Sequence, residues 1–455
     1  MKNNFFGKVD MSDQPFVADL HIHSKFSRAT ARDFDLENIY IWSQIKGISV
    51  VGTGDFTHPE WYVQLTEKLL PEEPGLYRLR PEIEAGCDER VPFSCRAPVR
   101  FVLSCEISNI YKKMDVTRKN HNLVFFPDLE CVRRFNNRLA SIGNIYSDGR
   151  PILGLGARDL LEIVLETSET GFLVPAHIWT PWFSMLGSRS GFDSIEACFE
   201  DLSPYIFAAE TGLSSDPSMN WRVSDLDRIT LISNSDAHSP SKLGREANLF
   251  KTDMSYHAIR SAMLKGDSCK FSGTIELYPQ EGKYHADGHR NCQVCLNPAQ
   301  TRVHRGICPV CGKPLTLGVM HRVEELSSRP EGVRAPRARP FYRLIPLESL
   351  LSEILRVGVQ SKKVKQTYRT VVDTLGSEIS ILQHVDRERI ASVGVSLLDE
   401  AVMRMRDNRV SYSPGYDGRY GKVHIFSDRE RQRLMVSDIF SPPLKAKPNP
   451  LPLCK

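Results

Sequence analysis

Apolar and polar positions alternate in a regular order from residue 16 to about residue 270. Short apolar runs predict strands, and the longer amphipathic stretches between them predict helices. The predicted strands are residues 17–22, 48–52, 99–104, 122–126, 172–176, 206–209 and 229–233. Helices are predicted at residues 36–46, 61–70, 129–140, 157–166 and 256–265, where the apolar spacing suits one buried face. The alternation predicts a barrel of parallel strands covered by helices.

The pattern changes after residue 275. A stretch rich in Gly, His and Asp (279–290) ends the repeat, and two closely spaced cysteine pairs follow. A loop rich in Pro and Arg (328–340) precedes a helical pattern at 346–405, and residues 410–426 predict a turn-rich ribbon. We therefore expect a catalytic barrel (1–275), a cysteine module (276–325), a basic helical DNA-binding domain (326–440) and a disordered tail (441–455).

The composition is that of an ordinary globular protein, with 455 residues of which 41% are hydrophobic and 25% charged. No apolar run approaches the ~20 residues of a membrane span, and the N-terminus lacks the apolar core of a secretory signal. We expect a cytoplasmic, nucleoid-associated protein with reduced thiols and no membrane partner. Residues 322–455 hold 24 Lys and Arg against 16 Asp and Glu, so this third is a candidate for binding a polyanion. A solvated basic surface explains the excess equally well.

Imidazole and carboxylate side chains follow the apolar runs at several strand ends. His21 and His23 lie two residues apart on the first predicted strand and therefore face the same side. The other candidates, each placed after a predicted strand, are Asp55, His58, Glu106, His177, Glu210, Asp236 and His238. The carboxyl ends of barrel strands converge on one rim, where such folds place their chemistry. His121 precedes its strand, so it reaches this rim only if that strand runs in an unusual direction.

A ligand set of this size and kind fits two or three divalent ions such as Zn²⁺, Mn²⁺ or Mg²⁺. Ions about 3.5–4 Å apart stabilise both the attacking and the leaving oxygen of a phosphoester displacement. The sequence holds no Walker loop and no Gly-x-Ser-x-Gly elbow, so nucleotide-driven transfer and serine hydrolysis have no support. We expect metal-dependent phosphoester hydrolysis in which Asp236, His238 and Glu106 take part in catalysis.

The cysteine pairs predict a second kind of metal site. Cys292-x2-Cys295 and Cys308-x2-Cys311 are separated by twelve residues, a spacing typical of a four-thiolate structural zinc site. Such a closed site stabilises a small fold and leaves no open position for catalysis. Three nearby histidines are expected outside the coordination shell unless one of them replaces a cysteine; they are His285, His289 and His304.

Several of these residues together resemble the motifs of the PHP (polymerase and histidinol phosphatase) superfamily. The resemblance spans residues 16–275 and rests on Asp19-Leu20-His21-Ile22-His23-Ser24, the strand carrying Glu106, His121, His177 and Ser235-Asp236-Ala237-His238. It implies a distorted seven-stranded barrel with a trinuclear metal site. Two departures concern the third metal position: two residues separate Asp55 from His58, and Ser27-Arg28-Ala29 stands where the superfamily often has an acid or a histidine.

Further segments resemble the endonuclease Q family over nearly the whole chain, to about Phe426. They are residues 52–59, residues 282–289, the cysteine module and Pro414-Gly415-Tyr416-Asp417-Gly418-Arg419-Tyr420-Gly421. The resemblance implies a DNA repair endonuclease that cuts 5′ of deaminated bases (uracil, hypoxanthine, xanthine) and of abasic sites. Because such an enzyme takes the altered nucleotide out of the stack, we expect a base pocket beside the metal rim.

Candidate DNA or base contacts are Arg28, Trp182, Asn220, Trp221, Lys362 and Lys363. Core packing for the aromatic residues, and a solvated helix face for the lysines, explain these positions equally well. Two other functions remain open: a phosphatase of a small phosphate monoester, and an inactive nucleic-acid-binding accessory. Replication or repair proteins are candidate partners in addition to DNA.

Overall fold

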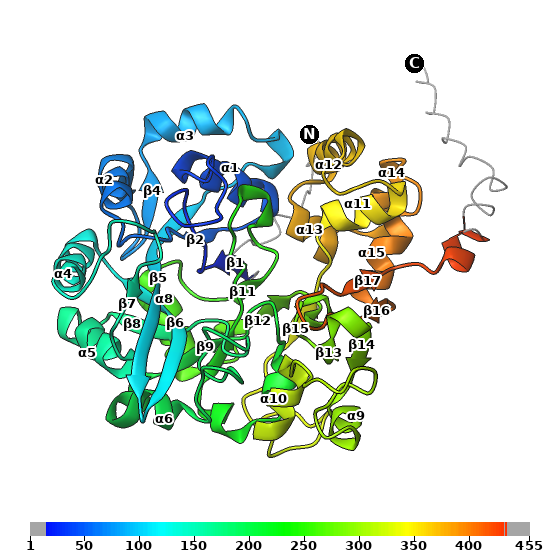
Figure 1. Ribbon diagram of the computed structural model, residues 1–455. Coiled ribbons are helices and arrows are strands. Elements are labelled where there is room, and N and C mark those ends of the chain that lie inside the picture. Colours follow the sequence, from blue (N-terminus) through cyan, green and yellow to red (C-terminus); the bar gives the residue numbers. More distant parts are fainter. Residues whose placement is uncertain (1–14, 432, 435–455) are drawn as a thin grey trace, which may run out of the picture.

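The computed structural model describes residues 15–431, 433 and 434 (Figure 1). The predicted tail at 441–455 lies outside the described residues. The largest element is a mixed sheet of eleven strands with the order β15-β12-β11-β1-β2-β5-β4-β3, to which β6, β7 and β8 are attached through β5 and β6. Its strands are β1 (Phe16–Asp19), β2 (Val50–Gly52), β3 (Leu69–Pro71), β4 (Tyr77–Leu79), β5 (Arg100–Lys113), β6 (Val116–Phe126), β7 (Ile152–Leu153), β8 (Phe172–Pro175), β11 (Ala247–Phe250), β12 (Phe271–Glu276) and β15 (Phe341–Arg343).

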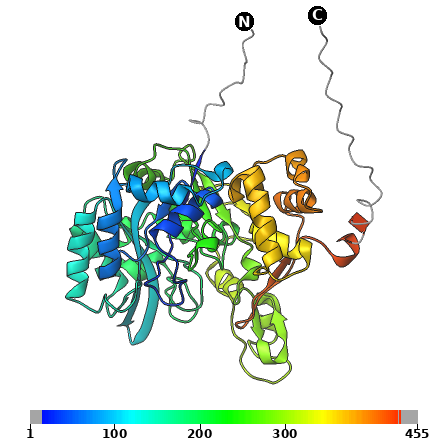
Figure 2. The ribbon, with the colours of Figure 1, turned by 90° about the horizontal axis from the view of Figure 1, so that it is seen from above.

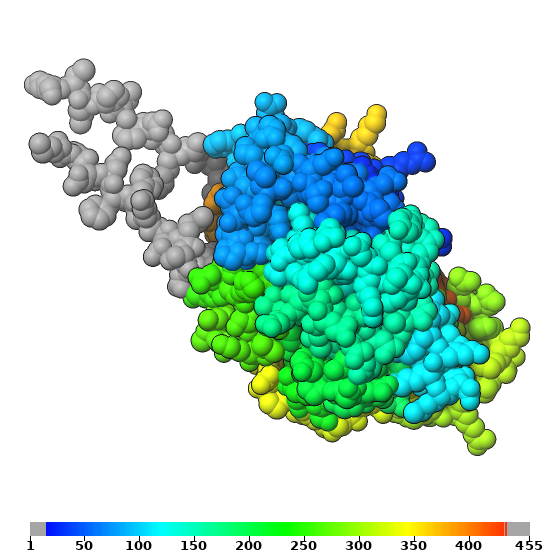
Figure 3. All heavy atoms as spheres, turned by 90° about the vertical axis from the view of Figure 1, so that its left-hand side faces the viewer, coloured from blue at the N-terminus to red at the C-terminus, as the bar shows by residue number. Residues whose placement is uncertain are grey.

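Helices cover this sheet, and all five helices predicted from the sequence are present. They are α1 (Leu36–Lys46), α2 (Pro59–Lys68), α4 (Leu129–Ala140), α5 (Ala157–Thr167) and α8 (Tyr256–Lys265), joined by α3 (Pro81–Asp88), α6 (Ile195–Phe199) and α7 (Pro217–Asn220). Local chemistry sets their ends: the Asp35 carboxylate accepts the Asn38 N–H at the start of α1, and Gly47 ends that helix at φ 89°. From the side of α4 and α5, the surface is formed mainly by the N-terminal half of the chain (Figure 3).

The prediction of parallel strands throughout is wrong. β1, β2 and β5 are parallel, as are β9 (Ala208–Glu210) and β10 (Thr230–Ile232), but β6 runs antiparallel to both β5 and β8. Among the described strands no ladder joins β8 to β9. A single isolated bridge joins Ile22, which follows β1, to Ala237, which follows β10. Hydrogen bonding alone therefore does not close a ring, and the barrel stays a prediction.

β5 and β6 form a long hairpin that the sequence pattern did not reveal. β5 continues nine residues beyond the predicted end at residue 104, and the chain reverses at Met114 and Asp115, both with positive φ (49° and 60°). A two-residue turn of this kind matches the twist of antiparallel strands. β6 runs in the opposite direction to β5, and its residue His121 therefore lies beside β5 and β8. This is the unusual strand direction that the sequence analysis required for His121 to reach the rim.

The C-terminal part forms two smaller units. One contains β13 (Asp287–His289), β14 (Val294–Leu296), α9 (Pro298–Val303) and α10 (Val319–Leu326), and Figure 2 shows its yellow-green segment projecting from the rest of the molecule. The other contains α11 (Leu347–Leu355), α12 (Lys362–Leu375), α13 (Glu378–Gln383), α14 (Arg387–Ser392), α15 (Leu398–Arg406) and the ribbon β16 (Ser411–Ser413) and β17 (Lys422–His424). No helix in the described part of the chain is long and apolar enough to cross a membrane.

A buried ion pair joins the helical unit to the sheet unit. Lys46, at the end of α1, places its Nζ 2.5 Å from Glu378 Oε2, and both side chains are nearly inaccessible. Glu378 also accepts hydrogen bonds from the Tyr368 hydroxyl at 2.7 Å and from the Leu347 N–H at 3.0 Å. Because every partner of the carboxylate is itself buried, this contact fixes how the two units face each other.

Candidate metal centre

Imidazole and carboxylate groups meet in two clusters at one end of the sheet. The first cluster brings ligand atoms of His21, His23 and Asp236 within 4.8 Å of one another, and the second does the same for Glu106, His121 and His177. His21 and His23 follow β1, Glu106 lies on β5, His121 on β6, His177 after β8 and Asp236 after β10. The structure therefore brings together six of the ten candidate residues that the sequence places at the barrel rim.

Glu106 stands between the two clusters. Its Oε2 lies 3.3 Å from His23 Nε2 and 3.7 Å from His21 Nε2. Its Oε1 lies 2.8 Å from His121 Nδ1 and 3.0 Å from His177 Nε2. Since each oxygen of one carboxylate faces a different cluster, Glu106 is placed to bridge two cations.

The donor atoms of the first cluster fit a metal ion. The Nε2 atoms of His21 and His23 and the Oδ1 atom of Asp236 are buried, and none has a hydrogen-bond partner among the described residues. An unpaired buried polar atom is costly, and three that face one another are satisfied together by a single cation. Zn²⁺ and Mn²⁺ accept such mixed nitrogen and oxygen donors.

Two further carboxylates orient the imidazoles. His21 Nδ1 lies 3.0 Å from Glu210 Oε1, and His23 Nδ1 lies 3.0 Å from Asp55 Oδ1, so each ring keeps its Nε2 directed at the cluster. Asp55, predicted as a ligand, also accepts hydrogen bonds from the hydroxyls of Ser24 and Ser27 at 2.7 and 2.9 Å. With its oxygens occupied in this way, Asp55 is a positioning residue behind His23.

The electrostatics of the centre favour bound cations. Burial lowers the pKa of His21, but Glu210, Glu106 and Asp236 outweigh burial and raise that pKa well above its ordinary value. Burial likewise raises the pKa of Glu106, whereas His121, Arg150 and His21 bring it well below the usual range. Carboxylates that stay ionised in a buried place attract positive charge, whether protons or metal ions.

The two remaining predicted ligands lie outside both clusters. His58 is buried and stacks on Phe26, with ring centroids 4.3 Å apart. His238 lies beside His23 with ring centroids 4.5 Å apart, but its Nδ1 is 2.9 Å from the backbone oxygen of Asp236. In the described residues the geometry therefore gathers ligands for two ions, and the third position predicted from the PHP motifs has no such group.

Three residues at this centre have a strained backbone conformation. His177, Asp236 and Asp55 have φ values of 28°, 45° and 49°, which side chains bearing a Cβ rarely adopt. Such conformations persist where the surrounding structure enforces them, and they are common at active sites.

The sequence analysis missed Arg150, which borders the metal centre. Its Nη1 donates to Glu106 Oε2 at 3.0 Å, and the side chain is 25% exposed. The preceding residue, Gly149, lies close to the Asp55 carboxylate. A Cβ at this position would lie 2.3 Å from Asp55 Oδ2, so the loop can come this near only with glycine. Asp148 accepts the Arg150 N–H at 3.1 Å and pairs with the exposed Arg28 at 3.2 Å. An arginine in a loop carries no periodic pattern that could have singled it out.

The cysteine module forms a different ligand group from the one predicted. Ligand atoms of His289, Cys292, Cys308 and Cys311 lie within 4.8 Å of one another, whereas Cys295 is not among them. Cys295 lies on β14 opposite Gly288 and lines a separate cavity of about 370 Å³. The four-thiolate prediction therefore does not describe the observed group.

Two similar turns explain why His289 takes this place. Cys308-x2-Cys311 is followed by Gly312 at φ 69°, whose N–H donates to the Cys308 oxygen at 3.0 Å. His289-x2-Cys292 is followed by Gln293 at φ 56°, whose N–H donates to the Arg290 oxygen at 3.1 Å. The first ligand turn thus starts at His289, and Cys295 falls on the strand beyond it. We infer a structural zinc site of three thiolates and one imidazole.

His289→Ala will therefore weaken the zinc site and lower stability, while Cys295→Ser will leave both near wild type. Losing one of four ligands leaves a coordination position that water fills poorly, and the binding free energy of such a site contributes to folding. The measurement is the thiolate-to-metal absorption of the Co²⁺-substituted protein, which the thiol-free barrel centre does not produce. A loss of this absorption in Cys295→Ser with retention in His289→Ala would contradict the assignment.

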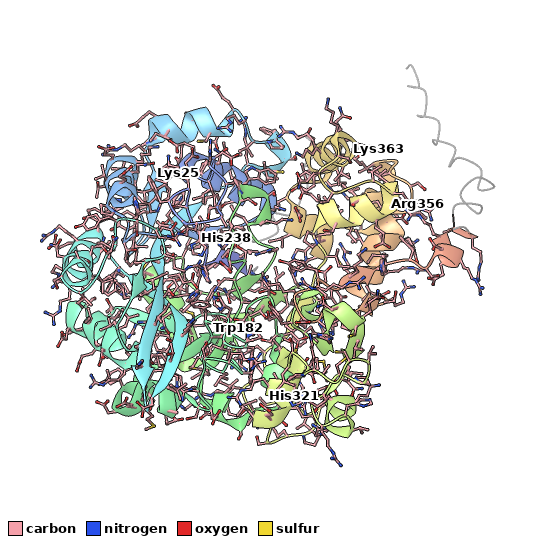
Figure 4. The ribbon with its side chains drawn as sticks, in the orientation of Figure 1. Lys25, Trp182, His238, His321, Arg356 and Lys363 are labelled. Atoms are coloured by element: carbon pink, nitrogen blue, oxygen red, sulfur yellow. The ribbon has the colours of Figure 1, made fainter. Side chains whose placement is uncertain are left out.

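The predicted DNA contacts divide into buried and accessible residues. Asn220 is buried and accepts the Trp179 indole N–H at 2.7 Å. Trp221 packs edge-on against Phe341 with ring centroids 5.7 Å apart. Trp182 is 40% exposed, and in the view of Figure 4 it lies between His238 and the module. Lys362 and Lys363 are exposed in the first turn of α12, with Lys363 well away from His238 in that view.

Comparison with known proteins finds relatives in both sequence and structure. Residues 346–409 match the family model of the MJ0043 C-terminal domain. The chain is 31% identical over 254 residues to protein MJ0043 of Methanocaldococcus jannaschii, covering 54% of this chain and 31% of that protein. It is 30% identical over 418 residues to protein YqxK of Bacillus subtilis, covering 89% of this chain and 98% of the other. The chain thus spans less than a third of the first relative and nearly all of the second.

Two solved structures share the fold over most of the chain. One is the lesion-specific endonuclease PfuEndoQ from Pyrococcus furiosus, with a TM-score of 0.77 and 31% identity over 90% of this chain and 95% of that one. The other is endonuclease Q in complex with a 27-mer duplex carrying an abasic lesion at the active site. That comparison gives a TM-score of 0.77 and 31% identity over 91% of this chain and 98% of the other.

Proposed function

This chain belongs to the endonuclease Q family, and from this premise we propose that it is a metal-dependent DNA repair endonuclease. Its substrate is the phosphodiester bond on the 5′ side of a deaminated base (uracil, hypoxanthine or xanthine) or of an abasic site. Two relatives support this substrate class, since one is described as lesion-specific and the other binds a duplex with an abasic lesion at its active site.

The observation that carries the proposal is the pair of ligand clusters that share Glu106. A carboxylate with one oxygen toward each cluster would help to hold two divalent ions, and paired ions supply the chemistry of in-line displacement at phosphorus. His21, His23 and Asp236 would hold one ion, and His121 and His177 the other, each together with Glu106. When bound, such ions lower the pKa of a water molecule and neutralise charge on the phosphate.

The side chains of the protein prepare this site. Glu210 and Asp55 hold the rings of His21 and His23 in one orientation, so no reorganisation is needed when substrate arrives. Bulk water has little access to the ligands, since His21, His23 and Glu106 are each at most 1% exposed. Exclusion of water strengthens every charge interaction with the phosphate.

Arg150 supplies a fixed positive charge beside the ions. A guanidinium has five N–H donors, and among the described residues only the Nη1 bond to Glu106 uses one from the Arg150 side chain. The side chain is 25% exposed, so the remaining donors could bind a non-bridging phosphate oxygen. We assign Arg150 to binding the scissile phosphate and to stabilising the charge that develops on it.

In this proposal the three units of the chain have different roles, and the units beyond the catalytic one serve DNA binding. The catalytic unit (1–275) is a distorted PHP-type barrel, the module (276–325) is held by one structural zinc ion, and the basic helical unit (326–440) contacts phosphates. Arg28, 76% exposed at the rim of the centre, and the lysines at the start of α12 are the candidate phosphate contacts. Contacts of this kind position the duplex and do not depend on its sequence.

A panel of duplexes tests the proposed substrate class. The protein is incubated with Mn²⁺ and with duplexes carrying a single uracil, hypoxanthine, xanthine or abasic site, beside an undamaged duplex and a small phosphate monoester. Cutting of lesion duplexes with no cut in the undamaged one supports the proposal. Turnover of the monoester with no cut in any duplex would instead assign the centre to a phosphatase.

A further inference from the structure

A line of aromatic and cationic side chains leads away from the second ligand cluster. His121 packs against Phe183 with ring centroids 5.0 Å apart, and the neighbouring Trp182 meets Tyr284 edge-on at 5.6 Å. Lys283 lies 5.7 Å from the centroid of Tyr284 and 6.0 Å from that of Tyr420. We call Trp182, Tyr284, Lys283 and Tyr420 the aromatic strip. Three segments that are far apart in the sequence build it.

The strip is open to solvent although it is rich in large rings. Trp182 is 40% exposed and Tyr420 is 71% exposed, and Lys283 is exposed between them. Side chains of this kind combine flat apolar faces with positive charge. Unstacked bases of a nucleic acid fit such a surface, because the rings stack on the base and the cation faces the phosphate.

The C-terminal segment is held rigidly in this place. The N–H groups of Gly415 and Gly421 donate to the backbone oxygens of Gln280 and Glu281 at 2.9 and 3.0 Å. A Cβ on Gly421 would lie 2.0 Å from the Gln280 oxygen, so only glycine permits this approach. Asp417 adds hydrogen bonds from the Arg290 N–H and the Thr316 hydroxyl, both at 2.7 Å.

The loop of Trp182 is held as firmly. Phe183 adopts φ 63°, and its N–H donates to the Ser190 hydroxyl at 3.2 Å. The Arg189 N–H donates to the Pro181 oxygen at 2.9 Å, which closes the loop below Trp182. Because both loops are fixed, the exposed rings lose little conformational freedom when a base stacks on them.

We propose that the aromatic strip stacks on the bases of the DNA that lose a neighbour at the lesion. The proposal rests on the proposed function, since it takes lesion DNA as the partner. Extruding one nucleotide from a duplex leaves the adjoining bases with an uncovered face. Trp182 and Tyr284 cover such a face near the second cluster, and Lys283 and Tyr420 extend the contact along the strand.

Binding to uncut DNA tests the strip separately from cleavage. All variants carry Asp236→Asn, so a failure to cut does not affect the readout. Trp182→Ala and Tyr284→Leu are expected to weaken binding of an abasic duplex about tenfold each, as loss of one base stack would. Binding of an undamaged duplex should change much less. Tyr205→Ala, which removes another tyrosine that is 54% exposed, is the matched control and should bind like the parent.

A fluorescent base gives a second readout. The fluorescence of a 2-aminopurine placed next to the abasic site should fall when the parent protein binds. With Trp182→Ala at saturating protein, the fluorescence should stay high. Equal losses of affinity on lesion and undamaged duplexes, or unchanged affinity and quenching in both strip variants, would overturn the proposal. A parent protein that shows no preference for the lesion duplex would also overturn it.

Discussion

Asp236→Asn abolishes cutting of lesion DNA, with kcat lowered by about 10³-fold or more, because the amide cannot replace an anionic ligand of the first cluster. The Asp236 carboxylate lies 3.2 Å from His23 Nε2 and 3.6 Å from His21 Nε2, so it is central to that cluster. DNA affinity should stay within about threefold of wild type, since phosphate contacts elsewhere provide most of the binding free energy. The measurements are single-turnover cleavage and binding to an abasic duplex.

Asp159→Asn provides the matched control for this variant. Asp159 is an exposed carboxylate on α5, and its loss should leave cleavage unchanged. Metal content should fall in Asp236→Asn and stay constant in the control. Cleavage by Asp236→Asn at the wild-type rate would show that the first cluster is not the catalytic centre.

Arg150→Gln is expected to lower kcat by about 10²- to 10³-fold, because a charged donor aimed at the phosphate acts mainly in the transition state. Bound metal and the midpoint of thermal unfolding should change little, since Glu106 keeps both imidazole partners of the second cluster. Arg150→Lys should recover part of the activity through its charge, without the paired geometry of a guanidinium.

Nicked product DNA separates a phosphate contact from a structural role. The wild type should bind a nick with a 5′-phosphate more tightly than one with a 5′-hydroxyl, and Arg150→Gln should lose this preference. Arg28→Gln, at a neighbouring but exposed position, should keep it. A retained preference in Arg150→Gln, or a loss of bound metal that accounts for the fall in rate, would refute the assignment.

Strand periodicity predicted that most of the candidate ligands would come together, because these residues follow buried strands. His21, Glu106 and Asp236 each come at or after an apolar run, and parallel strands bring such positions to one edge. His121 could not be placed in this way, since nothing in the apolar pattern marks the reversal at residues 114 and 115 that turns β6 around. Strand direction is a property of the turn, and two residues with positive φ carry that information.

The roles of individual polar residues were harder to predict than their location. Asp55 follows β2 and Asp236 follows β10, yet one orients an imidazole and the other faces the cluster. Asp55 takes the orienting role because the hydroxyls of Ser24 and Ser27 donate to its carboxylate. Sequence spacing does not specify these contacts. Asn220 is a candidate DNA or base contact, and sequence spacing does not reveal that its side chain is buried and accepts the Trp179 indole N–H.

The cysteine module shows how a familiar spacing misleads. Cys292 and Cys295 have the separation of a ligand pair, and a sequence reading has no reason to begin the turn three residues earlier. The backbone favours His289 as the first ligand, because Gln293 in the left-handed region ends a turn that starts at His289. Cys295 then lies on β14 and lines a separate cavity.

We propose that paired metal ions held by the two clusters cut DNA beside a lesion. The most direct test uses protein stripped with a chelator and an end-labelled duplex with one abasic site, analysed at nucleotide resolution with and without added Mn²⁺ or Zn²⁺. The account predicts no cut without metal and a single cut immediately 5′ of the lesion when metal is restored. Cutting that persists in excess chelator, or metal-dependent cutting at positions unrelated to the lesion, would contradict it.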